Sequence, residues 1–268
     1  MRRAQVLLKT VGVGLMLVFA SVASEAQSAP AKVEQGRSGV AAQAPGPGDT
    51  YSGGAHSEDA QLAKVLGQMD AAAAKFQTAQ AAFSWDQLTA VVQEHDVQKG
   101  TIAFRRTSKN GAETAMVAHV QTEDGQPAPK DVLFRNGQLQ LYQPAIKQET
   151  ILQAGNNREQ FESYATLGFG GSGKDLAASW NVTYGGAEMV DGVAVAKLTL
   201  LPKYVAANQM FTRIEIWIDP ATATSRKQVF YTPGGDTRTA TYTNVKLNGT
   251  PESAFTLKIP SGTQVVRR

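Results

Sequence analysis

The stretch of this sequence with the clearest chemical pattern is glycine-rich and spans residues 168–174. Its letters, GFGGSGK, have the spacing G-x-x-x-x-G-K of the phosphate-binding loop in nucleotide-binding proteins. That loop follows a buried strand, and a Ser or Thr after its lysine holds magnesium. Here residues 158–164 have a helical pattern, and Asp175 occupies the hydroxyl position. The pattern therefore predicts a flexible turn before a short helix, with Asp175 favourably placed against the helix dipole, and no nucleotide site.

The other candidate catalytic and metal-binding groups are isolated. His56, His95 and His119 have no metal-ligand spacing, and the sequence contains no cysteine, so we expect no metal site. Ser172 is out of register with the G-x-S-x-G pattern of hydrolases. Carboxylates such as Asp219 lie at predicted turns, where they cap the backbone. We expect no catalytic residue, no cofactor and no enzyme activity.

Residues 1–26 have the features of a secretory signal peptide. Basic residues come first, an apolar run covers residues 11–22, and the small residues Ser24 and Ala26 suit the −3 and −1 positions. The apolar run is too short to span a bilayer, and we expect cleavage after Ala26 and export. Without this segment 23 basic and 22 acidic residues remain, which excludes a strongly basic protein and argues against nucleic-acid binding.

Two further segments follow the predicted cleavage site. Residues 27–57 are rich in Ala, Gly, Pro, Ser and Gln, and we expect a disordered tether there. Residues 58–268 carry the patterns of a folded domain, and because it has no disulfide its hydrophobic core must stabilise it.

The apolar pattern predicts a helix at the start of this domain and strands in the rest of it. The apolar positions on one face of the predicted first helix are Leu62, Leu66, Met69, Ala73, Phe76 and Phe83. The predicted strands are residues 101–106, 132–134, 139–142, 193–201, 213–218, 227–231 and 239–247, with short helices at 158–167 and 174–180. Turns such as Asn136-Gly and Asp191-Gly separate them, as in hairpins. These elements predict the α+β fold class, with a long antiparallel meander. The sheet of this meander could curl into a barrel.

Two patterns in the strands point to a second covered face. Ile102, Phe104 and Arg106 share one side of their strand. If that side is buried, the guanidinium must find acceptors or cost several kcal/mol; if Arg106 lies past the buried part, it is solvated. Residues 213–218 and 227–231 are apolar on both sides. That indicates either a lid or hydrophobic ligand over one face, or a central strand between two helical layers.

Seven segments, in this order, carry a family resemblance between about Gln61 and Val266. They are the leading helix and residues 100–106, 134–144, 198–203, 211–219, 244–248 and 255–262. In these the chain resembles the LolA family of periplasmic lipoprotein carriers. The resemblance implies an incomplete antiparallel β-barrel with a helical lid over a hydrophobic cavity. It departs from the family at Thr107, where the family has proline, and in a longer segment up to Asp131.

The resemblance also implies a function, partners and site residues. Such a carrier accepts an acylated lipoprotein from an inner-membrane ABC-type complex and delivers it to an outer-membrane lipoprotein receptor, and we expect a periplasmic monomer. Arg106 matches an arginine that bonds to the lid backbone in the closed, empty state. The candidate cavity lining is Ile102, Phe104, Leu139, Leu141, Ile214, Ile216 and Ile218. The opposite strand phase, with Trp217 and Tyr142, stays open, as does a periplasmic sensor or scaffold that binds lipid or lipoprotein without shuttling it.

Overall fold

The structure is a computed structural model that describes residues 53–106, 114–155, 164, 166–203 and 210–268. Within it His56–Arg268 form one unit. The predicted signal peptide and the tether up to residue 52 lie outside the described residues, as does most of the short helix predicted at 158–167. The first helix, α1, covers Gly53–Ala73 and so begins ahead of Glu58, where the sequence analysis starts the domain.

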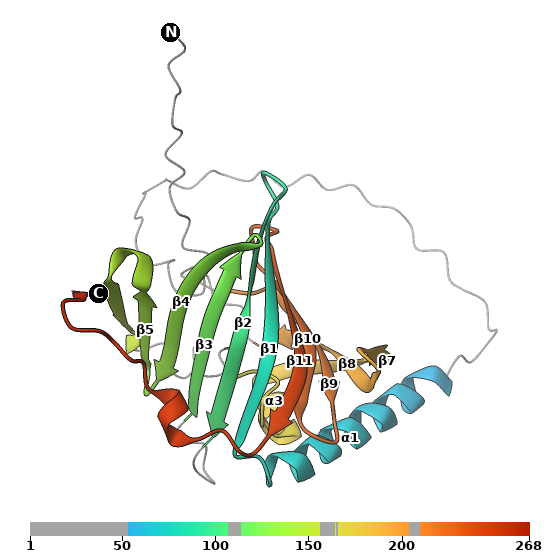
Figure 1. The fold of residues 1–268 in the computed structure, drawn as a ribbon. Helices are drawn as coiled ribbons and strands as arrows, with labels where there is room; N and C mark the ends of the chain where they lie inside the picture. Colours follow the sequence, from blue (N-terminus) through green and yellow to red (C-terminus); the bar gives the residue numbers. More distant parts are fainter. Residues whose placement is uncertain (1–52, 107–113, 156–163, 165, 204–209) are drawn as a thin grey trace. The chain divides into compact units, whose positions relative to one another are not determined.

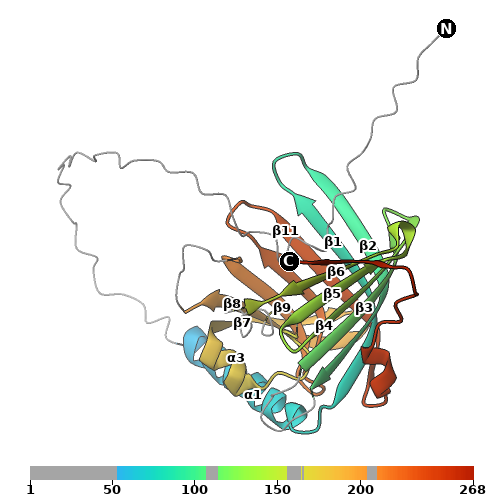
Figure 2. The ribbon, with the colours of Figure 1, turned by 90° about the vertical axis from the view of Figure 1, so that its left-hand side faces the viewer.

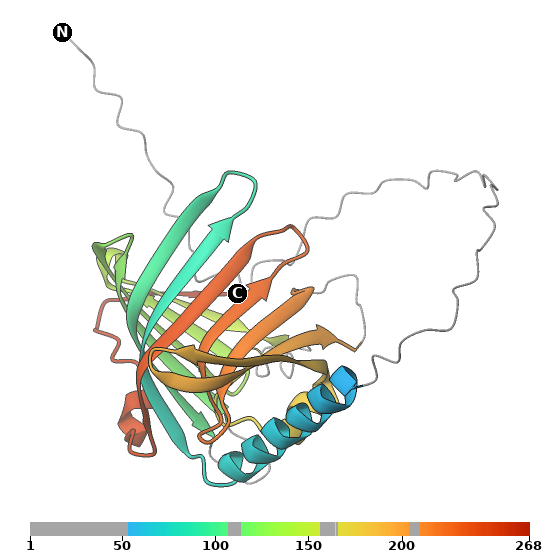
Figure 3. The ribbon, with the colours of Figure 1, turned by 90° about the vertical axis from the view of Figure 1, so that its right-hand side faces the viewer.

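Within the described ranges, twelve strands form a single sheet, which is strongly curved in Figures 1 and 3. They are β1 (Thr78–Thr89), β2 (Glu94–Arg106), β3 (Thr114–Glu123), β4 (Gln126–Arg135), β5 (Gln138–Gln143), β6 (Gln148–Gln153), β7 (Trp180–Val190), β8 (Val193–Pro202), β9 (Arg213–Asp219), β10 (Thr224–Tyr231), β11 (Thr237–Leu247) and β12 (Gln264–Arg267). Their order is β12-β6-β5-β4-β3-β2-β1-β11-β10-β9-β8-β7, antiparallel except for β12 beside β6. Because β7 and β12 are edges, the sheet is open. The α+β class and the open antiparallel sheet are confirmed.

Two boundaries predicted from local patterns are wrong. The first helix ends at Ala73, and Phe83 lies in β1. β1 pairs with β2 on one side and β11 on the other, and this two-sided pairing outweighs the alanine-rich helix propensity nearby. Helix α3 covers Gly173–Ser179, and Trp180 begins β7. No predicted strand range covers β1, β3, β6, β7 or β12.

The pairing registers divide the sheet into two faces, and we call the face with Ile102 the inner face. Two rows of cross-strand neighbours on it are Phe104–Met116–Phe134–Leu139 and Ile102–Ala118–Val132–Leu141. A third row, Trp85–Ala240–Gln228–Ile216, joins the other half of the sheet to the same face. All the apolar residues proposed as cavity lining therefore share one face, because Ile214 and Ile218 alternate with Ile216.

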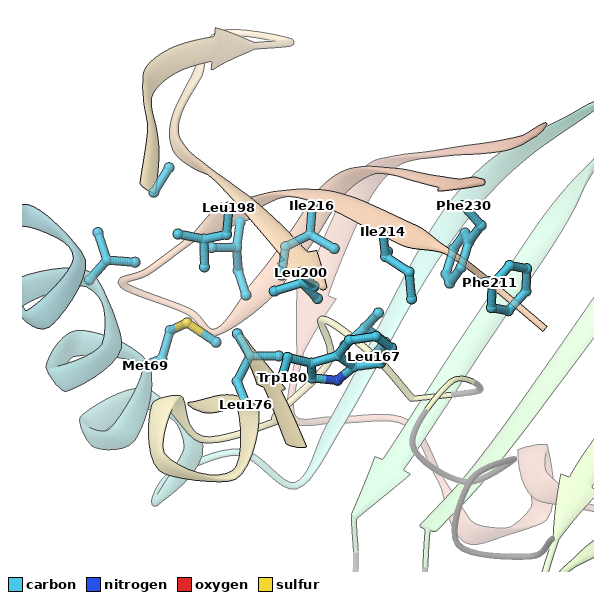
Figure 4. Packing of buried hydrophobic residues seen from close by; sticks show 13 residues of the cluster. Met69, Leu167, Leu176, Trp180, Leu198, Leu200, Phe211, Ile214, Ile216 and Phe230 are labelled. Atoms are coloured by element: carbon cyan, nitrogen blue, oxygen red, sulfur yellow. The ribbon is translucent and has the colours of Figure 1, made fainter. Parts of the chain in front are cut away.

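The main hydrophobic core lies where α1 and α3 cover the inner face of β8–β10 (Figure 4). Its buried members are Val65, Met69, Leu167, Leu176, Trp180, Ala196, Leu198, Leu200, Phe211, Ile214, Ile216, Ile218 and Phe230. A large apolar side chain buried in this way contributes about 1.5–3 kcal/mol. The two helices are thus held mainly by apolar contacts to the sheet.

The outer face of β2–β4 is covered by the chain's own C-terminal part. The short helix η4, Glu252–Phe255, places Phe255 there with only 1% of its surface exposed. The guanidinium of Arg105 lies 4.8 Å from the Phe255 ring centre and pairs with Glu252. Beyond η4 the chain reaches β6, where β12 adds a parallel edge strand. The last residues of the chain therefore pack against and pair with strands from much earlier in the sequence.

Candidate functional site

The glycine-rich loop, defined here as residues 167–173, pairs with the sheet instead of forming a phosphate cradle. Phe169 makes a β-bridge with Thr224. The Gly170 N–H donates to the Ala223 carbonyl (3.0 Å), and the Gly168 carbonyl accepts from Ser225 N–H (2.7 Å). These main-chain bonds attach the loop to the β9–β10 turn and to β10, and the absence of a nucleotide site stays a prediction.

Close approach to neighbouring elements explains three glycines of the loop. A Cβ at Gly170 would lie 2.3 Å from the Phe76 ring, and one at Gly173 would lie 2.3 Å from the Leu66 carbonyl oxygen of α1. A Cβ at Gly168 would lie 2.7 Å from Ser225. Gly168 and Gly170 also have positive φ values of 75° and 72°, which favour glycine. Close packing and backbone conformation thus explain the glycines of the pattern that resembled a nucleotide motif.

The loop places Phe169 against the inner face of the sheet. Its ring stacks on Phe104 with centroids 3.7 Å apart and an interplanar angle of 11°. Tyr242 meets the same ring edge-on at 4.9 Å and 85°. Phe169 is 2% exposed, so it is one of the core residues of this half of the sheet.

Arg106 lies at the end of β2 and holds the loop by its main chain. Its Nη1 donates to the Gly170 carbonyl at 2.5 Å, and its Nη2 donates to Asp175 Oδ2 of α3 at 3.1 Å. Its side chain is 27% exposed and shares the inner face with Phe104, so the inward alternative describes this structure and the fully solvated one does not. The family resemblance implies a bond from this arginine to lid backbone, and the role of the loop and α3 as a lid stays a prediction.

Asp175 connects this contact to the start of α3. Burial disfavours its charge, but hydrogen bonds from Ser172 and Arg106 outweigh that and hold the pKa of Asp175 below its usual value. Ser172 is the helix N-cap, and its hydroxyl accepts from the Asp175 N–H at 3.0 Å. The carboxylate therefore stays charged at neutral pH and accepts from Arg106.

Gln228 of β10 holds the same loop from the other half of the sheet. Its Nε2 donates to the Leu167 carbonyl at 2.6 Å, and its Oε1 accepts from the Tyr242 hydroxyl at 3.1 Å. Burial raises the pKa of Tyr242 well above its usual value, so the hydroxyl remains a donor. Arg106 and Gln228 thus fix carbonyl groups on either side of Phe169.

The helices α1 and α3 are joined to each other as well as to the sheet, and Figure 2 shows them side by side. Asp70 of α1 accepts from the Lys174 N–H at 3.1 Å, which satisfies a free donor at the start of α3. Gly173 brings α3 against α1 at Leu66, as described above. We call α1, α3 and the glycine-rich loop together the cover.

A cavity of about 210 Å³ lies between the cover and the sheet. It is lined by Met69, Arg106, Thr114, Thr166, Leu167, Gly168, Phe169, Gly171, Ser172, Asp175, Leu176, Ser179, Trp180 and Ile216. Sites for drug-sized ligands usually enclose about 300–1,000 Å³, so this cavity is smaller than such sites.

The residues proposed from the sequence are distributed unevenly around this cavity. Arg106 and Ile216 line it. Ile214 and Ile218 pack in the core beneath the helices, and Phe104 lies under Phe169. Ile102, Leu139 and Leu141 are buried elsewhere on the inner face. The cavity lining as a whole remains a prediction.

The alternative strand phase faces away from the cover. Trp217 packs with Val195 and Val229 on the outer face, and its Nε1 donates to Glu188 at 2.7 Å. Tyr142 is opposite Asp131 in the register and is also on the outer face.

Phe169, Gln228 and Tyr242 were not predicted as members of the site. Flanking glycines single out Phe169, and Gln228 directly precedes the apolar residues Val229 and Phe230, but neither signal shows which segments meet. In the described part of the chain no group of three or more His, Cys, Asp or Glu is placed to hold a metal ion. Of the helices within the described ranges, none has the length and apolar character needed to cross a membrane.

Neither a protein-family model nor a curated protein matches this sequence. Solved structures similar to it include an uncharacterized conserved protein from Thermus thermophilus, at 14% identity and a TM-score of 0.48 over 78% of this chain and 99% of that one. The MucA/MucB complex of Pseudomonas aeruginosa is 15% identical with a TM-score of 0.42, over 74% of this chain and 61% of that one. A LolA superfamily protein from Nitrosomonas europaea is 12% identical with a TM-score of 0.35, over 73% of this chain and 97% of that one. Because these TM-scores are below 0.5, we infer the function from the contacts within this chain.

Proposed function

We propose that this protein binds the acyl chains of lipoproteins on its inner face and carries them from the inner to the outer membrane. The observation that carries the proposal is the contact of Arg106 with the cover. A charged side chain at the end of an apolar strand holds a helix and a loop down by hydrogen bonds to Gly170 and Asp175. Such contacts can break and reform, whereas purely apolar packing gives no comparable control over opening.

The energetics of such a carrier follow from the two kinds of contact. Each acyl methylene removed from water is worth about 0.8 kcal/mol, so even a short buried length of chain gives tight binding. The hydrogen bond from the Arg106 guanidinium to the Gly170 carbonyl is worth about 1.5–3 kcal/mol, and the more exposed pair with Asp175 about 0.2–1 kcal/mol. Both are lost when the cover opens. The loaded, open form is therefore raised in free energy relative to the closed, empty form. This difference favours hand-over of the cargo.

The partners belong to the same proposal. The predicted signal peptide supports export, and a carrier between two membranes works in the periplasm. There it would receive cargo from an inner-membrane ABC-type complex and pass it to an outer-membrane lipoprotein receptor. The sheet and its cover are complete within one chain, which supports a monomer.

The test compares Arg106→Leu with the wild-type chain, each co-expressed with a triacylated lipoprotein. Mass spectrometry of the organic extract of the purified protein measures bound acyl groups, and membrane fractionation measures delivery. We expect the variant to retain cargo and to slow delivery, because its closed state has lost the two hydrogen bonds. Arg213→Leu is the matched control, since Arg213 lies over Tyr231 on the outer face. An extract free of acyl groups from both proteins, or normal delivery by Arg106→Leu, contradicts the proposal.

A further inference from the structure

The ring of Phe169 stands where the cavity meets the apolar inner face of β2. It lines the cavity on one side. On the other side it stacks on Phe104, whose cross-strand neighbour is Met116. Further along β2 the same face continues with Ile102, beside Ala118. A chain entering through the cavity thus meets the Phe169 ring before it reaches the rest of the inner face.

The contacts around this ring are those that a hydrocarbon ligand would make. Phe104 offers a flat apolar surface, and Tyr242 offers a ring edge whose hydroxyl is already bonded to Gln228. The Tyr242 hydroxyl therefore keeps its partner if an apolar ligand takes the place of the Phe169 ring. The space filled by the ring is thus bounded by apolar surface and by one hydroxyl that is already hydrogen-bonded.

The segment that carries Phe169 is attached to the sheet by a small number of hydrogen bonds. Gly168 and Gly170 flank it, and their positive φ values show backbone conformations that other residues adopt with strain. Side-chain hydrogen bonds from Arg106 and Gln228 hold the carbonyls on either side. Two backbone bonds to the β9–β10 turn and β10 complete the attachment. The segment that carries the ring is thus held by these hydrogen bonds and one isolated β-bridge, and not by a continuous ladder of strand pairing.

We propose that Phe169 is an internal plug, whose ring fills the apolar subsite that an acyl chain takes in the loaded protein. The proposal rests on the proposed function, in which acyl chains bind to the inner face. Because the Phe169 ring is part of the same chain, it competes with an acyl chain for the subsite at a high effective concentration. The apparent affinity for the acyl chain is then the intrinsic affinity multiplied by the fraction of molecules in which the subsite is free. The plug also keeps the apolar wall of the empty carrier covered.

Fluorescence titration of the full chain with a polyene fatty acid tests the plug. Phe169→Ala removes the ring, and Phe169→Leu is a milder variant for the case in which the alanine variant does not fold. Phe255→Ala is the matched control, because it deletes a ring of equal burial from the outer face. Folding of each variant is checked by circular dichroism before titration. We expect the dissociation constant to fall about tenfold or more for Phe169→Ala, less for Phe169→Leu, and not for Phe255→Ala.

The possible outcomes separate the plug from the function. Binding by wild type that is not tightened in either Phe169 variant overturns the plug and leaves acyl binding standing. Binding that appears only when the ring is removed supports both. No binding by wild type or by any folded variant overturns both. Equal tightening in Phe255→Ala also overturns the plug, since the effect would then come from general loosening of the fold.

Discussion

Replacing Gly170 by alanine tests whether the glycine-rich loop is built for close packing. A Cβ there would lie 2.3 Å from the Phe76 ring, a distance that forces either the ring or the loop to move. Overpacking of this kind costs about 1–3 kcal/mol. The φ of 72° adds the strain of a left-handed alanine, about 1–2 kcal/mol. The expected loss of unfolding free energy is therefore about 2–5 kcal/mol.

Gly171→Ala provides the matched control within the same loop. A Cβ at Gly171 has no neighbour within 4 Å among the described residues, and its φ is not positive. Both variants reduce the entropy of the unfolded chain equally, so that contribution cancels in the comparison. In a thermal melt, a difference of about 3 kcal/mol lowers the midpoint of a domain of this size by about 6–12 °C.

The result that would refute this reasoning is equal stability of the two variants. Urea titration gives the free energies, and hydrogen exchange shows where the loss occurs. We expect faster exchange of the Gly170 amide in Gly170→Ala, because its bond to Ala223 must shift with the loop. A stability loss without faster exchange in the loop would place the strain elsewhere, and the packing argument would then be wrong.

Two further predictions concern polar contacts. The hydrogen bond to Asp131 (2.7 Å) outweighs partial burial and raises the pKa of His119 above its ordinary 6.5, so its stabilising effect is full below about pH 6.5 and is lost as pH rises through the raised pKa. Because the pair is partly exposed, His119→Ala should cost at most about 1 kcal/mol near pH 5 and less near pH 9, by urea titration; an equal loss at both contradicts this. Gln228→Leu leaves the Leu167 carbonyl and the Tyr242 hydroxyl without their partner, which costs about 1–3 kcal/mol. Gln228→Glu keeps an acceptor oxygen for the Tyr242 hydroxyl but, when ionised, has no donor for the Leu167 carbonyl, so it should restore the Tyr242 bond alone. A fully stable leucine variant would rule out the second anchor of the loop.

Local patterns predicted the sheet better than the site. Alternation along residues 101–106 and 213–218 predicted two strands, but the phase that faces the cover stayed open. The pairing registers, and not the local pattern, place Ile102 and Ile216 on one face. Helix propensity misled near β1, because the alanines there take part in a sheet whose partners β2 and β11 are not local. Short-range patterns carry no information on which distant strand will pair.

The contacts that hold the cover join residues far apart in the chain. Arg106 meets Gly170 across 64 positions, and Gln228 meets Leu167 across 61. Burial of Arg106 was one of two interpretations from the residues alone, and the family resemblance supplied its bond to lid backbone. Nothing local marks Gln228 as its counterpart, because its role depends on where β10 lies relative to the loop.

Strand β12 and the β1–β11 pairing affect how a newly made chain completes its fold. Asn248 caps the start of β1 with 171 positions between it and Gln77, and β12 joins β6 only when the final residues exist. In a chain that has been synthesised only up to residue 236, β1 and β6 each have one edge with unpaired N–H and C=O groups. Such edges can pair wrongly with other incomplete chains. Such long-range closure also slows folding, so these unpaired edges stay exposed for longer than they would in a sheet built from local hairpins alone.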